Sequence, residues 1–317
     1  MTRLFHDQPI PESLRGSIIA LGNFDGFHLG HQAVVSRAVQ RGAHERRPVI
    51  VATFDPHPVR HFKPDTPPFR LTTLDQREEL FAHAGADAML VFNFGAELAS
   101  TTAEDFVSKL LADHLGAAGI VTGEDFTFGK GRGGNVDVLR DRGAAQDIVA
   151  ETVGAVLLDG VRISSGRIRE ALQAGDPAAA IHQLTRPFAI RAEVIHGNKR
   201  GRGFGWPTAN MKLGPYLRPA YGVYAVRVRL PDANGFGGAE YDGVANLGHR
   251  PMFEPEELLE AHLFDFDGDL YGQNIEVALH HYLRPEVKFE THDELIAQIG
   301  RDAEEAKRLL AAGATLA

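Results

Sequence analysis

Hydrophobic and polar positions follow one pattern up to about residue 185 and a different one after it. In the first part, short apolar runs alternate with segments in which apolar residues recur at helical spacing. The apolar runs cover residues 17–21, 48–54, 87–92 and 119–122. Runs of this length are typical of strands buried on both faces, and their alternation with helices indicates a mostly parallel sheet. We therefore predict an α/β domain over residues 1–184.

Two pairs of residues in this part predict where helices begin. Thr73 lies three residues before Gln76, and Thr101 lies three residues before Glu104. A threonine followed at this distance by Glu or Gln is a capping box, in which side chain and backbone bond to each other at the first turn of a helix. We expect one helix to run from Thr73 to about His83 and another to open at Thr101.

The second part of the chain contains strand-like runs separated by Gly, Pro, Asn and Asp. The runs cover residues 188–195, 223–230, 241–247, 258–266 and 275–283. Strands without intervening helices indicate an antiparallel sheet, most simply a small barrel. The Thr291/Glu294 pair then predicts a terminal helix. Its expected buried stripe consists of Leu295, Ile299, Ala303, Ala306 and Leu310. We therefore predict that residues 185–317 form a second domain, a β-barrel with a terminal helix.

Composition excludes several classes of function. The 317 residues carry a net charge of −9, which argues against a general binder of nucleic acids or anionic membranes. The chain has no cysteine, so disulfides, thiolate nucleophiles and Cys-based zinc sites are excluded. It also has no signal-peptide pattern and no apolar run long enough to span a bilayer. We expect a cytoplasmic protein.

A candidate phosphate site follows the first apolar run. Residues 22–31 contain a glycine turn and then the start of a helical pattern, the layout that binds anions in open α/β sheets. His28 and His31 flank Gly30 near this helix start, where both can donate hydrogen bonds to phosphate oxygens. A metal-binding His pair and purely structural histidines are the alternatives. The position between strand and helix favours phosphate binding.

Two further segments of the first domain have the composition of phosphate-binding loops. Residues 130–134 form a basic, glycine-rich loop that either closes over an anion or is a solvated connector. Ser164 and Ser165 precede a helical pattern that contains Arg169. They are ordinary N-cap residues, and with Arg169 they also have the chemistry of a phosphate clamp. His57 and His61 lie near Asp55, but Pro58 between them disfavours a metal site.

The stretch from residue 197 to 210 has the strongest phosphate-binding composition in the second domain. Its glycines allow backbone amides to approach an anion, and its cations add positive charge. The candidate ligands are Gly197, Lys199, Gly201, Arg202 and Gly205. After Pro207, Thr208 and Asn210 share one face of an extended segment and offer oxygen ligands of the type that holds Mg²⁺ against phosphates. A glycine-rich hairpin with a proline turn is the alternative.

Glu260 is the candidate general base of the second domain. Strand alternation places it on the face opposite the flanking leucines, Leu259 and Leu263. A carboxylate that faces a phosphate loop can accept the proton of an attacking hydroxyl group. The alternative is a solvent-facing strand residue. Arg284, before Pro285, is either a ligand contact or a surface cation.

Taken together, these segments resemble the bacterial bifunctional riboflavin kinase/FAD synthetase family over residues 18–310. The adenylyltransferase half of that family has motifs that match residues 22–31, 53–58, 123–129 and 164–169. The kinase half has motifs that match residues 197–210, 222–224, 246–251, 260–266 and 269–272. Each motif alone is weak, but their number and order are specific. The resemblance implies a Rossmann-like nucleotidyltransferase domain followed by a riboflavin kinase barrel.

For the second domain, the resemblance implies transfer of the γ-phosphoryl group of ATP to the 5′-hydroxyl of riboflavin. Glu260 is then the base, and Thr208 and Asn210 hold Mg²⁺. In the first domain, the phosphate of the resulting FMN attacks the α-phosphate of a second ATP and releases pyrophosphate.

His28, His31 and Arg169 are the implied catalytic residues of this adenylylation. Over both domains, the implied substrate contacts are Gly22, Asn23, Phe24, Asp25, Asp125, Ser164, Ser165, Gly197, Lys199, Gly201, Arg202, Gly205, Asn246 and Arg284.

Two positions depart from the family pattern, because Gly166 and Met252 replace the usual threonines. Gly166 removes a hydroxyl from the expected phosphate clamp. The alternatives are a nucleotidyltransferase for another substrate with a non-catalytic barrel, a flavin or nucleotide sensor without activity, and a nucleic-acid-binding barrel. The intact Glu260 and histidines disfavour the sensor, and the acidic charge disfavours nucleic acid.

Overall fold

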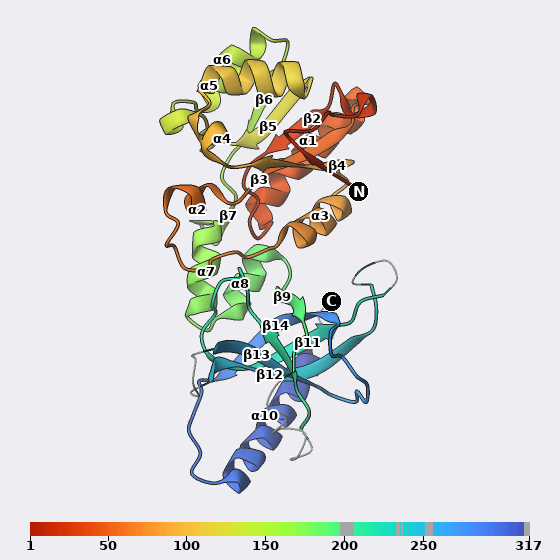
Figure 1. Cartoon of the computed structure of the whole chain (residues 1–317), viewed down its shortest axis with the longest axis vertical. Helices are drawn as coiled ribbons and strands as arrows, with labels where there is room; N and C mark the ends of the chain where they lie inside the picture. Colours follow the sequence, from red (N-terminus) through yellow and green to blue (C-terminus); the bar gives the residue numbers. More distant parts are fainter. Residues whose placement is uncertain (197–205, 233–234, 236, 251–255, 314–317) are drawn as a thin grey trace. The chain divides into compact units, whose positions relative to one another are not determined.

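The chain folds into two compact units (Figure 1). The computed structural model describes residues 1–196, 206–232, 235, 237–250 and 256–313. The first unit comprises Met1–Pro67 and Thr72–Ser165, and the second comprises Pro68–Leu71 and Gly166–Ala317. Helices α7 (Ser165–Gln173) and α8 (Pro177–Leu184) pack against the core of the second unit. The compact units therefore divide before the functional boundary predicted at residues 184/185, which stays a prediction.

The first unit is built on a six-stranded parallel sheet, as the alternating pattern predicted. The strands are β1 (Thr2–Phe5), β2 (Ile18–Leu21), β3 (Val49–Asp55), β4 (Ala88–Asn93), β5 (Gly119–Gly123) and β6 (Val149–Val153). Their order is β1-β4-β3-β2-β5-β6, and every neighbouring pair is parallel. The order reverses between β2 and β5, so the chain winds outward from β2 in both directions.

Helices cover both faces of this sheet because the central strands are apolar on both sides. One face packs against α1 (Leu29–Glu45) and α3 (Leu74–His83). The other packs against α4 (Ala96–Ser100), the π-helix η2 (Phe106–His114) and α6 (Val136–Ala144). Short elements complete the unit: η1 (Glu12–Leu14), α2 (Pro58–Phe62), α5 (Ala103–Asp105), η3 (Lys130–Arg132) and the hairpin of β7 (Leu157–Leu158) and β8 (Val161–Arg162).

Of the two capping boxes predicted for the first unit, one is present and the other is displaced. The side chain of Thr73 accepts from the backbone of Gln76, and the reciprocal bond is also made, so α3 begins where expected. The expectation for Thr101 was wrong, because Thr101 ends α4 as its C-cap and its hydroxyl donates to the carbonyl oxygen of Glu97. Its neighbour Thr102 caps α5 instead.

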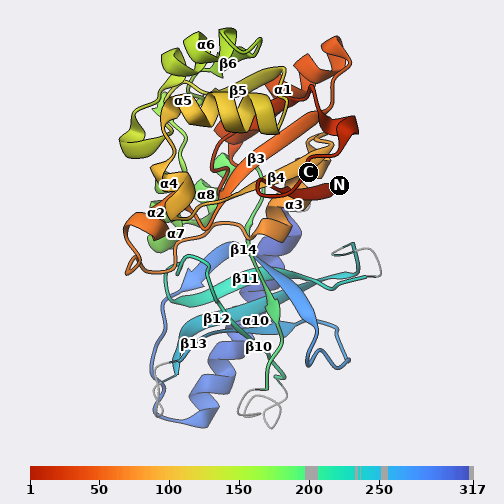
Figure 2. The same ribbon diagram turned by 45° about the horizontal axis from the view of Figure 1, so that its top comes forward.

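The second unit is a nearly closed antiparallel barrel of six strands (Figure 2). The strands are β9 (Phe188–Glu193), β10 (Ala209–Lys212), β11 (Gly222–Arg229), β12 (Glu240–Arg250), β13 (Glu256–Leu263) and β14 (Asn274–Arg284). Their order is β10-β13-β12-β11-β14-β9. A bridge between Ile195 and Asn210 links the two ends of this order. The predicted barrel is confirmed, with the short strand β10 added.

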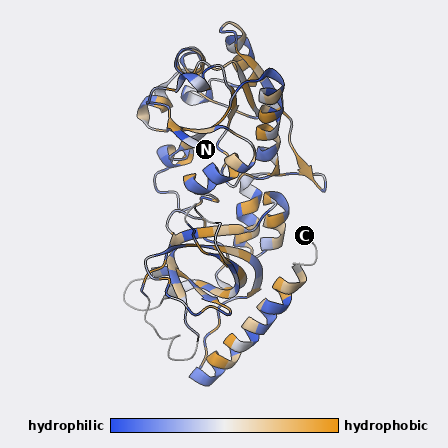
Figure 3. Ribbon diagram, turned by 90° about the vertical axis from the view of Figure 1, so that its right-hand side faces the viewer, coloured by the Kyte–Doolittle hydropathy of each residue, from blue (hydrophilic) through white to orange (hydrophobic). Residues whose placement is uncertain are grey.

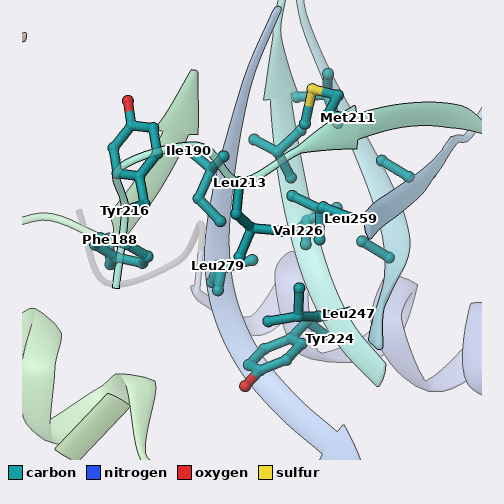
Figure 4. Close-up of a cluster of buried hydrophobic side chains, with 14 of the residues drawn as sticks. Phe188, Ile190, Met211, Leu213, Tyr216, Tyr224, Val226, Leu247, Leu259 and Leu279 are labelled. Carbon is teal, nitrogen blue, oxygen red and sulfur yellow. The ribbon is translucent and has the colours of Figure 1, made fainter. Parts of the chain in front are cut away.

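Alternate residues of these strands fill the barrel and leave the others for its outer surface. Figure 4 shows the interior, where Met211, Val226 and Leu259 from three strands pack together. On the outer surface, Val223, Ala225 and Val244 contact the terminal helix α10 (His292–Gly313). Apolar and polar positions alternate along this helix (Figure 3). Its predicted capping box is formed, since Thr291 and Glu294 bond to each other in both directions.

Candidate active sites

The turn between β2 and α1 lies where the strand order of the first unit reverses. From β2, the chain continues to β3 on one side, while β5 pairs with the other side. Open α/β sheets bind ligands outside the carboxyl ends of their strands at such a reversal. Residues 22–28 follow the carboxyl end of β2 directly and lead into the first turn of α1. The predicted phosphate turn therefore occupies the usual ligand position of its fold.

Two phenylalanines in this turn adopt a left-handed backbone conformation, which residues other than glycine rarely adopt. Phe24 has a φ of 52° and Phe27 a φ of 44°. Both rings are buried and meet the ring of Phe81 edge-on, with centroids 5.7 and 5.2 Å away. Strained conformations of this kind persist where surrounding packing enforces them, and they concentrate at functional sites.

The structure brings the two predicted histidines together at the start of α1. His28 is the N-cap residue, and its Nδ1 accepts a hydrogen bond from the backbone N–H of His31 at 3.3 Å. The two imidazole rings are stacked with centroids 3.6 Å apart. The ring of Phe24 meets His31 edge-on at 5.3 Å. Both histidines therefore lie at the positive end of a 17-residue helix, where an anion is stabilised.

Hydrogen bonds from residues outside the turn hold residues 22–28 in place. The carboxylate of Asp25 is buried and accepts from the backbone N–H of Thr72 at 3.0 Å and from its hydroxyl at 3.3 Å. The hydroxyl of Thr72 also accepts from the N–H of Gly26 at 3.0 Å. Ser165 donates to the carbonyl oxygen of Asp25 at 2.8 Å. Asp25 and Ser165, which were predicted as substrate contacts, form hydrogen bonds that hold the turn in place. Thr72 belongs to none of the predicted motifs.

The remaining predicted residues of the adenylylation site have other neighbours. Asp125 follows β5 and forms an exposed ion pair of 2.7 Å with Arg162. Arg169 belongs to the second unit, where its Nε donates to the carbonyl oxygen of Phe69 at 2.8 Å and its guanidinium stacks on the Phe69 ring. The roles predicted for Asp125 and Arg169 stay predictions.

In the second unit, three polar residues lie side by side across three strands of the outer barrel surface. Glu260 of β13 is directly opposite Asn210 of β10 on one side and Asn246 of β12 on the other. Directly opposed residues of antiparallel strands share one face of the sheet. Leu259 and Ala261 are buried in the interior, so the alternation predicted around Glu260 is confirmed.

Oxygen and aromatic groups extend this row on the β10 side. The side-chain amide of Asn210 donates to the carbonyl oxygen of Thr208 at 3.1 Å, which orients the amide within the row. The Nδ1 atom of His262 lies 2.7 Å from the carbonyl oxygen of Pro207. The Trp206 ring meets the His262 ring edge-on at 4.8 Å. Trp206 therefore borders the site.

A cavity of about 390 Å³ adjoins the row of Asn210, Glu260 and Asn246. It is bounded by the barrel, by α10 and by the segment before α10. Its volume is within the usual range for a site that binds a small molecule. The apolar side chains of the wall are Trp206, Val223, Val244, Ala245, Val287, Phe289, Leu295 and Ile299. The polar ones are Thr208, Asn246, Glu260, His262, Arg284, Glu286, His292 and Asp302. The cavity therefore combines a surface for a flat apolar ring with hydrogen-bonding groups near the predicted base.

Two predicted substrate contacts, Asn246 and Arg284, take part in hydrogen bonds within the cavity wall. The amide of Asn246 donates to a carboxylate oxygen of Glu286 at 3.1 Å. The guanidinium of Arg284 binds the carboxylate of Asp302 on α10. Glu286 and Asp302 were not identified from the sequence, because neither lies in a motif and each contact joins residues far apart along the chain.

The predicted phosphate loop of the second unit lies outside the described residues. This applies to Gly197, Lys199, Gly201, Arg202 and Gly205, and also to Met252. Within the described residues, no group of three or more His, Asp or Glu side chains is arranged to hold a metal ion. None of the helices in the described part of the chain has the length and apolar character that a bilayer crossing requires.

Two family models match successive parts of the chain. The FAD synthetase family model matches residues 10–167, and the riboflavin kinase model matches residues 184–310. The bifunctional riboflavin kinase/FMN adenylyltransferase of Haemophilus influenzae is 39% identical over 93% of this chain and 94% of that protein. The protein of the same description from Escherichia coli strain K12 is 40% identical over 90% of both chains. The chain belongs to the bifunctional riboflavin kinase/FMN adenylyltransferase family.

A solved structure supports this family fold over nearly the whole chain. It is a crystal structure from Streptococcus pneumoniae, described as a macrolide-efflux protein, with 30% sequence identity and a TM-score of 0.85. The likeness covers 97% of this chain and 99% of that one. Membership of the bifunctional family confirms the resemblance that the ordered motifs predicted.

Proposed function

We propose that this chain makes both flavin cofactors in sequence, first FMN from riboflavin and ATP, and then FAD from FMN and a second ATP. The second unit carries the kinase activity, and the first carries the adenylyltransferase activity. Family membership over both halves of the chain supports this assignment. The observation that carries it within the structure is the Asn210–Glu260–Asn246 row beside an apolar cavity.

The cavity beside this row has the chemistry that a riboflavin molecule requires. Its apolar wall, which includes Trp206 and Phe289, suits the flat isoalloxazine ring. The polar side of the cavity then receives the ribityl chain, whose terminal hydroxyl lies near Glu260. In this arrangement, Glu260 accepts the proton of the hydroxyl as its oxygen attacks the γ-phosphorus of ATP. The bond from the γ-phosphorus to the bridging oxygen breaks, and ADP leaves.

Thr208 and Asn210 have the donor set for Mg²⁺ at this site. Mg²⁺ is usually bound by one or two protein oxygen ligands together with water and substrate phosphates, so a group of three acidic side chains is not required. The hydrogen bond from the Asn210 amide nitrogen to Thr208 turns the amide oxygen away from that carbonyl. Mg²⁺ held there by Thr208 and Asn210 would neutralise charge on the phosphates. Glycines and cations of residues 197–205 would then bind the ATP phosphates.

The turn at residues 22–28 and the start of α1 have the chemistry for adenylyl transfer. A phosphate oxygen of FMN attacks the α-phosphorus of ATP, the bond to the bridging oxygen breaks, and pyrophosphate leaves. His28 and His31 donate hydrogen bonds to the negative charge that develops, with help from the helix N-terminus. Ser164 and Ser165, at the end of the first unit, keep their proposed role as further phosphate contacts.

An exposed group of aromatic rings near the carboxyl ends of β3 and β4 suits the flavin ring of FMN. Phe62 is 65% exposed, which is unusual for a large apolar side chain. Its ring contacts those of His61 and Phe94, with centroids 5.1 and 5.9 Å away. Stacking on such rings favours a planar aromatic ligand. Sequence reasoning considered His61 only as a metal ligand and missed this group.

One assay tests the proposal as a whole. Purified protein is incubated with riboflavin and MgATP, and flavins are separated over time. We expect FMN to appear first and FAD to follow, with ADP and pyrophosphate as the other products. A protein that converts supplied FMN to FAD but never phosphorylates riboflavin would contradict the kinase assignment. Failure to use FMN would contradict the adenylyltransferase assignment.

A further inference from the structure

A buried arginine of α3 contacts the backbone of the phosphate turn, although no motif includes it. Arg77 is only 3% exposed. Its Nη1 donates to the hydroxyl oxygen of Thr53 at 2.7 Å and to the carbonyl oxygen of Asn23 at 3.2 Å. The hydroxyl of Thr53 in turn donates to the same carbonyl oxygen at 2.7 Å. The side chain of Arg77 also lies 4.0 Å from the carboxylate of Asp55.

The position of this carbonyl determines where the next backbone N–H points. The carbonyl of Asn23 and the N–H of Phe24 belong to one planar trans peptide group, in which they point in opposite directions. Holding the carbonyl against Arg77 and Thr53 therefore turns the N–H of Phe24 to the other side of the turn. The same peptide enters the strained conformation of Phe24, with its φ of 52°. A charged donor bonds more strongly than a neutral one, so Arg77 is suited to maintain that strain.

We propose that Arg77 is a positioning residue for adenylyl transfer, acting through Thr53 and the carbonyl of Asn23 on the backbone that receives the ATP phosphates. The inference rests on the proposed adenylyltransferase activity of the first unit. Arg77 itself touches no reacting atom in this scheme. Its loss lets the turn relax, which misplaces the N–H groups and His28 relative to the phosphates. Small displacements of positioning groups reduce rates by as much as about 10²-fold.

A second buried arginine of the same unit provides a matched control. Arg41 is 7% exposed, pairs with Glu45 at 2.6 Å and donates to the carbonyl oxygen of Val149 at 2.9 Å. Its guanidinium packs against Gly119, where a Cβ atom would lie 2.6 Å from it. These contacts support α1 and the edge of the sheet and do not include the turn. Arg41→Met therefore removes an arginine that is buried and hydrogen-bonded to a similar degree, without removing any contact to the phosphate turn.

The experiment compares Arg77→Met, Thr53→Val, Thr53→Ser and Arg41→Met in the full-length protein. Adenylylation of supplied FMN is measured at a temperature where each variant is folded, with kcat and the KM for ATP determined separately. Thermal unfolding is followed in parallel. We expect Arg77→Met and Thr53→Val to lower kcat/KM for ATP by about tenfold or more. Thr53→Ser keeps the hydroxyl and retains most activity, and Arg41→Met lowers the unfolding temperature with kcat/KM within about twofold of the wild type.

The outcomes separate the positioning role from general stability and from the proposed function. If Arg77→Met and Arg41→Met have equal kcat/KM after correction for the folded fraction, the inference is wrong. Wild-type activity of Thr53→Val would overturn it even if Arg77→Met does not fold. A wild-type protein that forms no FAD would instead refute the adenylyltransferase function on which the inference rests.

Discussion

The carboxylate of Asp302 and the guanidinium of Arg284 form a two-pronged ion pair that joins α10 to the end of β14. Nε of Arg284 lies 3.0 Å from Oδ1, and Nη2 lies 2.7 Å from Oδ2. Gln298, one turn earlier on α10, donates to Oδ1 at 2.8 Å. Asp302 is only 6% exposed. Because α10 forms one wall of the cavity beside Glu260, this ion pair holds that wall against the barrel.

Replacing Asp302 with asparagine should therefore weaken both the fold and riboflavin binding. The variant leaves the charge of Arg284 without its carboxylate in a side chain that is 21% exposed. We expect a loss of about 2–4 kcal/mol in the unfolding free energy of the second unit, measured in urea. The KM for riboflavin should rise more than the KM for ATP. Glu304→Gln breaks only the exposed pair with Lys307 and should change stability by less than about 0.5 kcal/mol. An unchanged riboflavin KM in Asp302→Asn would contradict the proposed role of the ion pair.

Glu260→Gln should remove the general base of riboflavin phosphorylation and keep the shape of the site. We expect kcat for FMN formation to fall by about 10²-fold or more, the usual contribution of a positioned base. Adenylylation of supplied FMN should continue at the wild-type rate. Glu276→Gln is the matched control, since it removes a barrel carboxylate that pairs with Arg191 outside the cavity. Full kinase turnover by Glu260→Gln would exclude Glu260 as the base.

His31→Ala should have the opposite pattern of activities. Its ring is stacked on His28 at the start of α1, where the phosphates of ATP are proposed to bind. We expect FMN formation to continue and FAD formation to fall below detection in the product assay. Loss of both activities in a folded variant would argue against separate sites for the two reactions.

Two substitutions of His28 distinguish its capping role from its chemistry. Its Nδ1 accepts the N-cap hydrogen bond from His31, and an asparagine side chain can accept the same bond. His28→Ala should lose both the cap, at a cost of about 1 kcal/mol, and FAD formation. His28→Asn should recover most of the unfolding temperature but not the activity. If His28→Asn restores FAD formation as well, His28 is needed only as a cap.

The sequence predicted local features well because local residues determine them. The strand β2, the capping box at Thr73 and the outward direction of Glu260 all follow from neighbouring positions along the chain. Strand β6 was missed because it is a partly exposed edge strand without an apolar run. The helix start at Thr101 was misplaced because two adjacent threonines can each cap, and only the end of α4 distinguishes them.

Contacts between distant segments were beyond what sequence patterns determine. Arg77 and Asn23 are 54 residues apart, and their contact depends on the packing of α3 against the sheet. Arg284 and Asp302 are 18 residues apart, and their pairing depends on how α10 lies on the barrel. Motifs therefore identified residues proposed to touch the substrates, whereas the residues that hold them in place required the structure.

His280 of β14 should make the second unit less stable as the pH falls. Burial lowers the pKa of His280 to about 4, with smaller effects in the same direction from the positive charges of Arg227 and His281 and opposite ones from Glu240 and Asp242. In the unfolded chain its pKa is near the ordinary value of about 6.5. Above pH 6.5 both states are neutral at this residue. Between about pH 6.5 and 4, the unfolded state binds a proton that the folded state does not bind. The unfolding free energy therefore decreases as the pH is lowered through this range.

The measurement is the unfolding free energy of the wild type and of His280→Gln at several values of pH in this window. One proton taken up on unfolding corresponds to a slope of about 1.4 kcal/mol per pH unit. We expect the wild type to lose stability more steeply than His280→Gln by up to this amount, with parallel curves above pH 7. His281→Gln is measured in parallel, because burial lowers the pKa of His281 as well. Equal slopes for the wild type and His280→Gln would mean that folding does not lower the pKa of His280.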